Sequence, residues 1–223
     1  KPAATPFIAL WARMHAFDRE DLIRALYQER TLIRLPSAGT HQYIVATSQI
    51  AAYLRARQVL SGDTTREYLA YLLSLSANQG EADAICLEDV IPRVLEVVNT
   101  RGACTVEELC TWLPVLDRQI TSSLDGEAVP SKFRLGTRLI PALCAQGVLI
   151  PAQPRGSWRS ERDTYTTLSE WLPGLDLEPL TPREALGRVL HDYITAYGPV
   201  TIGDMIHWLG SARRQQVVSA LMT

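Results

Sequence analysis

The sequence predicts a mainly α-helical fold with small β-hairpins, which places it in the α+β class. A pattern of small, acidic and aromatic residues occurs twice at one constant offset: Gly102, Thr105, Glu108 and Trp112 recur as Gly198, Thr201, Asp204 and Trp208. A second similarity links residues 21–33 to residues 138–150, where Leu, Ile and Ala positions are shared. Since internal repeats identify the building unit of a fold, we expect several copies of one small unit.

The first half of that unit is predicted to be helix, turn, helix. Residues 91–100 carry apolar side chains at helical spacing, and a glycine follows them. Thr105 with Glu108 forms a capping box, in which a hydroxyl and a carboxylate satisfy free N–H groups at the start of a second helix. Residues 201–209 repeat this second helix. The helix before them is predicted to begin at Thr181-Pro182, a capping residue followed by proline.

The second half of the unit is predicted to be a third helix followed by a β-hairpin. Residues 138–146 are expected to be helical, and residues 147–152 and 164–168 are expected to be strands on either side of a polar tip. The recognition helix is expected to start within the segment 131–138; a surface helix with salt bridges is the alternative. Three helices with such a hairpin form a winged helix-turn-helix. The predicted fold is therefore a tandem array of winged helix-turn-helix repeats.

The repeats divide the chain into four predicted segments. They are a first winged helix without its front (residues 1–47), a helical connector (48–85), a complete second winged helix (86–170), and a linker with a third winged helix without its back (171–223). Within the connector, helices over 49–59 and 65–75 are expected to be separated by Ser61-Gly62-Asp63. The apolar linker 171–180 is expected to pack against the domains. We therefore expect the sequence to be part of a longer array.

The composition is that of an ordinary globular protein, with 47% apolar and 21% charged residues among 223. No run of about 18 apolar residues occurs, so no membrane span is expected, and no signal peptide is recognisable. The four cysteines lack the spacing of metal ligands, which favours reduced, mostly buried thiols in the cytoplasm. We expect no metal site and no cofactor, and the sequence does not indicate an oligomeric state.

Basic residues are concentrated in one stretch, although the net charge of −2 does not by itself favour nucleic-acid binding. Residues 131–162 contain six basic residues and one acidic residue, a local charge of +5. Because arginine and lysine neutralise phosphates and release counterions, this stretch predicts contact with double-stranded DNA. The predicted DNA-binding residues are Lys132, Arg134, Arg138, Arg155, Trp158, Arg159 and Arg162. The alternative is a solvated loop whose tryptophan packs on its own domain instead of on a base.

A shorter hairpin is predicted at residues 34–43. His41 at its tip could take part in acid–base chemistry or donate to a phosphate; a polar structural role is the alternative. The other histidines, His15, His191 and His207, are assigned to helices and to structural roles. The carboxylates do not form a persuasive catalytic pair, and no glycine-rich phosphate loop is present.

Six short stretches, distributed over most of the length of the chain, resemble sequences of one known family. They are Phe7–Arg13, Ala25-Leu26, Leu32–Arg34, Gly39-Thr40, Trp158–Pro173 and Tyr197–Gly210. These stretches resemble a bacterial family of winged-helix DNA-binding proteins. The family includes DNA glycosylases that unhook interstrand crosslinks, of the YcaQ and azinomycin-resistance type. The resemblance implies tandem winged helices around a DNA channel, and hydrolysis of the glycosidic bond of alkylated purines.

Two features of that family differ in this sequence. The family's catalytic Gln-x-Gln or Gln-x-Asp motif is expected just before Pro2-Ala3-Ala4, upstream of Lys1. Family hairpins often read Met-Arg-Gly-Thr-x-His, whereas residues 37–42 read Ser-Ala-Gly-Thr-His-Gln. The catalytic residues are therefore unassigned, and Thr40 and His41 are candidates for supporting contacts.

The favoured function is that of a cytoplasmic, nucleoid-associated DNA-binding protein that acts as a DNA glycosylase on alkylated or crosslinked purines in DNA repair. The alternative is a non-catalytic DNA-binding protein such as a transcriptional regulator. A third hypothesis is a protein-interaction scaffold built from winged helices. A Gln-x-Gln or Gln-x-Asp motif upstream would favour the enzyme, and salt-dependent DNA binding would separate the first two hypotheses from the scaffold.

Overall fold

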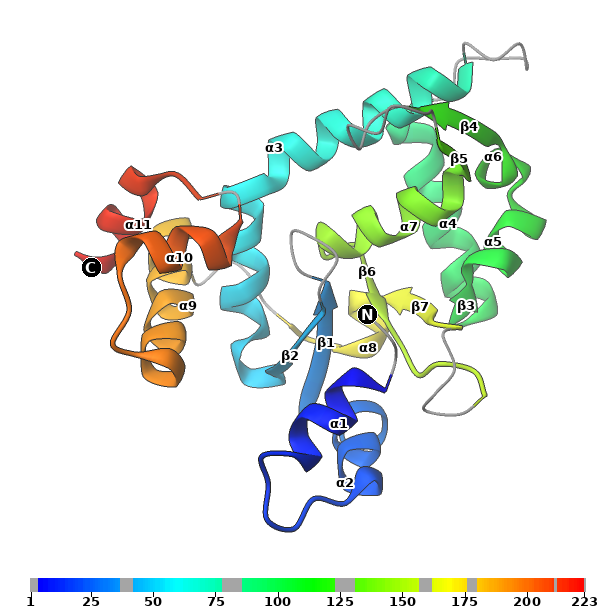
Figure 1. Cartoon of the computed structure of the whole chain (residues 1–223). Coiled ribbons are helices and arrows are strands. Elements are labelled where there is room, and N and C mark those ends of the chain that lie inside the picture. The colour runs from blue at the N-terminus through cyan, green and yellow to red at the C-terminus, as the bar shows by residue number, and fades with distance from the viewer. Residues whose placement is uncertain are drawn as a thin grey trace. The chain divides into compact units, whose positions relative to one another are not determined.

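The computed structural model describes residues 4–36, 42–77, 86–122, 131–156, 162–175, 180–210 and 212–222 (Figure 1). The chain is mostly helical with small antiparallel sheets, so the predicted α+β class is confirmed. It divides into two compact units: unit 1 is Lys1–Gly62 with Leu172–Thr223, and unit 2 is Asp63–Trp171. The division into four segments stays a prediction.

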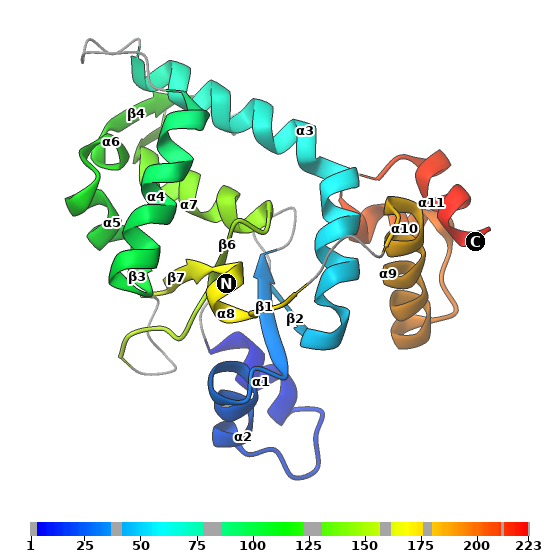
Figure 2. The same ribbon diagram turned by 180° about the vertical axis from the view of Figure 1, so that it is seen from behind.

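Three helices and a three-stranded antiparallel sheet make up most of unit 2, which Figure 2 shows from behind. The helices are α4 Leu87–Arg101, α5 Val106–Trp112 and α7 Leu135–Ala145, and the strands are β3 Cys104–Thr105, β6 Leu149–Pro151 and β7 Thr164–Thr167. Strand β7 lies in the middle, with Thr164 opposite Thr105 and Tyr165 opposite Pro151. The order helix, strand, helix, helix, strand, strand is that of a winged helix-turn-helix, and the short helix α8 Leu168–Trp171 follows it.

A second hairpin lies between α5 and α7 and was not predicted. Helix α6 Pro114–Asp117 leads into strands β4 Gln119–Ser122 and β5 Ser131–Arg134, which pair in an antiparallel manner. The helix that was predicted to start within the segment 131–138 does start there, at Leu135, whereas residues 131–134 are extended. Ile120 is fully buried and lies opposite Phe133, so apolar burial on one face holds β5 in the sheet and the helix begins at Leu135.

The core of unit 2 is built from one apolar face of each helix. Val94 and Val98 of α4, Leu109 of α5, and Leu139 and Leu143 of α7 are at most 1% exposed. Truncating a leucine at such a position to alanine costs about 2–5 kcal/mol of stability. Apolar spacing along the sequence therefore fixes which side of each helix faces inward, and the opposite side stays available to solvent.

Unit 1 joins elements from both ends of the chain. Its elements are α1 Thr5–Trp11, α2 Arg19–Ile23 with a π-helical continuation Arg24–Gln28, β1 Leu32–Pro36, β2 Gln42–Ala46, a 3-10 turn Thr47–Gln49, the first part of α3 Ile50–Ala77, α9 Pro182–Tyr197, α10 Ile202–Leu209 and α11 Arg214–Leu221. Strands β1 and β2 form the predicted hairpin, with Leu35 opposite Tyr43. His15 lies in the turn after α1, so its assignment to a helix is wrong, whereas His191 and His207 are helical as predicted.

Helix α3 is continuous over residues 50–77, so the two shorter helices predicted around Ser61-Gly62-Asp63 are wrong. A glycine inside a helix costs only about 1 kcal/mol relative to alanine. Burial on both sides of it offsets that cost: Leu54 is buried in the first half of the helix, and Leu69 and Leu72 are buried in the second half. Tertiary packing thus overrides a local turn signal.

The repeat at constant offset is confirmed as structure. Helices α4 and α9 end at Arg101 and Tyr197, and α5 and α10 begin at Val106 and Ile202, so both pairs keep the offset seen in the sequence. Each second helix starts with the predicted capping box, Thr105 with Glu108 and Thr201 with Asp204. The helix start at Thr181 is confirmed as well, and it carries a third capping box.

Candidate nucleic-acid interface

Helix α7 presents a stripe of exposed residues at the position of a recognition helix. Arg134, Thr137, Arg138 and Pro141 are exposed, and their spacing puts them on one face of the helix. The opposite face is buried in the core described above. The Thr137 hydroxyl donates to the Arg134 carbonyl oxygen over 2.7 Å, which secures the first turn. The helix thus offers its N-terminal turn to solvent, as helix-turn-helix proteins do toward DNA.

The basic side chains around this turn have partners close by. The Arg134 Nε lies 3.5 Å from the Asp117 carboxylate, and both side chains are about half exposed. The Arg138 guanidinium carbon lies 5.2 Å from the centre of the Phe133 ring. Lys132 is exposed on β5, one residue before Phe133. Exposed ion pairs and cation–π contacts of this kind contribute about 1 kcal/mol or less, so a phosphate can displace them at little cost.

The hairpin between β6 and β7 is the wing, and its base is held by a ladder of hydrogen bonds. The Ala152 amide donates to the Thr164 carbonyl over 2.8 Å, and the Thr164 hydroxyl donates to the Gln153 carbonyl over 2.8 Å. The Arg155 amide then donates to the Arg162 carbonyl over 3.1 Å. Both arginines are exposed at the base of the wing. The wing therefore begins as an ordered ribbon flanked by two cationic side chains.

Arg155 anchors the wing to the start of helix α5. Its guanidinium donates to the Glu108 carboxylate and, over 3.2 Å, to the Ala103 carbonyl oxygen. The same carboxylate accepts a hydrogen bond from the Thr105 amide over 2.9 Å. This backbone hydrogen bond, together with Arg155, lowers the pKa of the Glu108 carboxyl below its ordinary value. Sequence reasoning singled out Glu108 as a capping residue and Arg155 as a DNA contact, but missed that they pair.

The remaining predicted site residues lie outside the described part of the chain. Trp158 and Arg159 fall between strands β6 and β7 in the sequence, and Thr40 and His41 fall between strands β1 and β2. The structure brings Lys132, Arg134 and Arg138 together on β5 and the start of α7, and it brings Arg155 and Arg162 together at the wing base. A role in DNA binding stays a prediction for the whole set.

The cysteines of unit 2 are free thiols, and three of the four are buried as predicted. Burial raises the pKa of the Cys104 and Cys110 thiols. The Cys110 sulfur lies 3.4 Å from the Leu116 carbonyl oxygen, and Cys86 is exposed.

Within the described ranges no cluster of potential metal ligands occurs. Among the helices that the structure describes, none is both long and apolar enough to cross a bilayer.

Comparison with known proteins identifies similar sequences and folds. A family model described as DNA glycosylase AlkZ-like matches residues 1–223. The DNA glycosylase AlkZ of Streptomyces sahachiroi has a similar fold, with a TM-score of 0.58 at 20% sequence identity. The match covers 94% of this chain and 52% of that one, so the chain spans about half the length of the solved glycosylase. Comparison with curated proteins gives no match.

Proposed function

The chain belongs to the AlkZ-like DNA glycosylase family, and on that basis we propose that the full-length protein removes alkylated or crosslinked purines from double-stranded DNA. The family match over the whole chain is the observation that carries this proposal. The exposed first turn of α7 and the basic base of the wing support it, because both are suited to the phosphate backbone.

The proposed chemistry is hydrolysis of a glycosidic bond that is already weakened. An N7-alkylguanine carries a positive charge and is a good leaving group, so the enzyme has chiefly to position a water and to stabilise an oxocarbenium-like sugar. Side-chain amide oxygens, such as those of the family's Gln-x-Gln motif, can do both without a strong base. The Thr40 and His41 side chains, which follow strand β1 in the sequence, are our candidates for supporting contacts.

The proposed DNA-binding surface combines two structural features. One is the exposed stripe of α7 with Arg134 and Arg138, and the other is the wing from Arg155 to Arg162.

In addition, we propose that α9, α10 and α11 are the helices of a further winged helix, which would make the protein a tandem array. The support is the constant offset between α4–α5 and α9–α10 together with their matching capping boxes. The proposed place of action is the nucleoid, where the substrate is.

The test uses the full-length protein and two DNA substrates. One duplex carries a single N7-methylguanine, and the other carries a mustard crosslink between its strands. After incubation, alkaline cleavage of abasic sites reports base removal, and a binding assay on the same duplexes reports affinity and its salt dependence. We expect abasic sites in both substrates. Salt-dependent binding without any abasic site would replace the glycosylase by a non-catalytic DNA-binding protein.

A further inference from the structure

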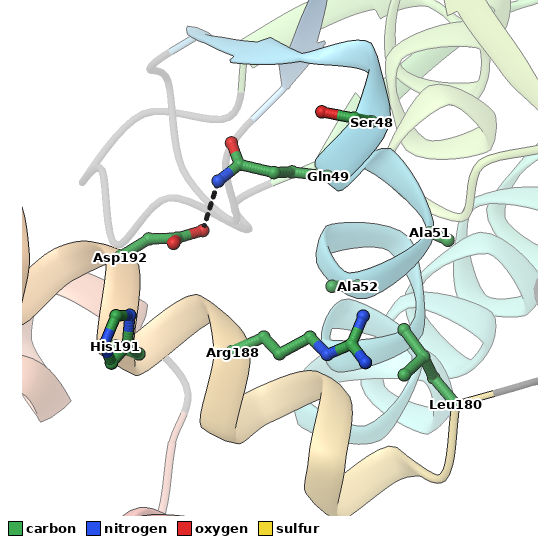
Figure 3. Close-up of a pocket in the computed structure, with 8 residues that line it drawn as sticks. All are labelled: Ser48, Gln49, Ala51, Ala52, Leu180, Arg188, His191 and Asp192. Atoms are coloured by element: carbon green, nitrogen blue, oxygen red, sulfur yellow. Dashed lines mark hydrogen bonds between the residues drawn. The ribbon is translucent and has the colours of Figure 1, made fainter.

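A small pocket lies in unit 1 between the start of α3 and the middle of α9 (Figure 3). Its volume is about 190 Å³. That is below the roughly 300 Å³ at which pockets for drug-sized ligands begin, so the pocket suits a small group. Ala51 and Ala52 on α3 leave the space open, and polar side chains of α9 face it.

Arg188 is the cation of this pocket, and the carboxylates one turn before and one turn after it on α9 hydrogen bond to other groups. Glu184, one turn before it, is held by the Thr181 capping box, with its carboxylate 2.6 Å from the hydroxyl. Asp192, one turn after it, accepts a hydrogen bond from the Gln49 amide over 3.0 Å. Both carboxylates that could pair with Arg188 at helical spacing are therefore already engaged. The pKa of the Glu184 carboxyl is lowered by its Thr181 hydrogen bonds and, to a smaller extent, by Arg188, so the guanidinium attracts this carboxylate without being hydrogen bonded to it.

Two further donors line the pocket at other positions. The Ser48 hydroxyl and the His191 ring line the same pocket, and Figure 3 shows Arg188 reaching from α9 toward α3. Ser48, Arg188 and His191 are all exposed, so a ligand attached to a long polymer can reach them. A planar guanidinium with five N–H donors matches the oxygens of a phosphate in pairs.

From this geometry we propose that the pocket binds a phosphate group of the DNA backbone, with Arg188 as the main ligand and Ser48 and His191 as additional donors. The Gln49–Asp192 hydrogen bond holds one oxygen of the competing carboxylate against the 3-10 turn that precedes α3. This inference rests on the proposed function for the source of the phosphate, but the chemistry of the pocket is independent of base removal. The contact would position DNA on unit 1, separately from the wing of unit 2.

The first experiment tests the phosphate chemistry alone. Inorganic phosphate is titrated into the isotope-labelled full-length protein, and chemical shifts are followed for the Ser48 amide, the His191 ring and the Arg188 side chain. We expect saturable shifts at these three groups that are lost in Arg188→Gln and reduced in Arg188→Lys, which keeps the charge but loses the planar fork. Absence of shifts up to tens of millimolar phosphate overturns the proposal, whether or not the protein removes bases.

The second experiment tests whether the phosphate comes from DNA. Affinity for an undamaged duplex is measured against salt concentration in the wild type, in Arg188→Gln and in the matched control Arg93→Gln, which removes the same charge from an exposed position on α4, outside the proposed DNA-binding surface. We expect Arg188→Gln to bind roughly five- to tenfold more weakly and to reduce the salt slope by about 0.9, the value for one lost phosphate contact. Equal losses in both variants, or no loss in Arg188→Gln, would show that DNA does not occupy the pocket.

Discussion

Tyr43 and Trp208 join the β1–β2 hairpin to helix α10, with their ring centres 5.8 Å apart. Trp208 also stacks on Tyr193 of α9, at 4.5 Å between ring centres. At the equivalent position in unit 2, Trp112 is covered instead by the Arg101 guanidinium, 4.4 Å from the ring centre. The two repeats thus share a tryptophan but use it differently, since Trp208 contacts the β1–β2 hairpin and Trp112 contacts an arginine.

Replacing Trp208 is therefore expected to loosen the hairpin. Trp208→Ala should lower the stability of unit 1 by about 2–3 kcal/mol. This loss is smaller than that expected for a fully buried tryptophan, because the Trp208 side chain is only partly buried. Hydrogen exchange should accelerate at the β2 amides Tyr43 to Val45, and Trp208→Phe should restore most of the protection. Trp112→Ala is the matched control, and it should leave β2 exchange unchanged. Equal acceleration in both variants would contradict a specific link between Trp208 and the hairpin.

Gly136 permits the close approach of α7 to the helices before it. A Cβ atom added there would lie 2.9 Å from the Cys110 sulfur and 3.2 Å from the Leu116 carbonyl oxygen. Gly136→Ala should therefore destabilise the protein by about 1–3 kcal/mol, the usual cost of overpacking. The control is Gly203→Ala on α10, where the nearest atom would be Thr201 Oγ1 at 3.5 Å, so that change should be neutral or stabilising by up to about 1 kcal/mol. Urea denaturation measures both, and equal stability of the two variants would argue against the close packing.

The acid sensitivity of unit 2 is expected to depend on Glu108. Its pKa is lowered from an ordinary value of 4.5, first by the Thr105 amide and then by Arg155. A carboxyl whose pKa is lower in the folded than in the unfolded state stabilises the fold above its unfolded value, and that contribution is lost as the pH falls through the folded value. Thermal denaturation between pH 7 and pH 3 should therefore show a shallower acid decline for Glu108→Gln below about pH 4.5. An unchanged decline would show that the carboxylate has no stabilising role.

How much of the fold could be predicted from the sequence depends on whether the contacts that stabilise each element are local. The capping boxes at Thr105 and Thr201 and the strands on either side of the wing follow from side chains a few residues apart, and they were predicted correctly. The β4–β5 hairpin could not be predicted in this way, because Ile120 and Phe133 pair only once their strands meet. The continuity of α3 across Gly62 depends likewise on leucines buried against other helices.

The candidate interface shows the same limit. A count of basic residues located the wing, but it could not reveal that Arg155 is already paired with Glu108, since these residues are far apart in the sequence. Nor could it reveal the pocket at Arg188, because that site depends on two carboxylates finding other partners. Partner choice is a property of the folded chain, and no residue type or spacing indicates it.

The wing is expected to bind DNA without regard to base sequence. Charge reversal of Arg155 and Arg159 together should weaken binding to about the same extent for all duplexes, and it should reduce the salt slope by about one for each lost phosphate contact. Since Arg155 also anchors the wing, Glu108→Gln serves as the control that removes the anchor and keeps the arginine. If Glu108→Gln weakens binding as much as the charge reversal does, anchoring rather than phosphate contact explains the effect.

The freed base itself is the most direct measure of the central claim that the full-length protein is a DNA glycosylase. A duplex carrying N7-methylguanine is incubated with excess protein, and the base released into solution is quantified by mass spectrometry against a reaction without protein. We predict release of N7-methylguanine well above the spontaneous background, with an abasic site left in the strand for each base released. Tight binding to the duplex with release no faster than in the absence of protein would contradict the claim.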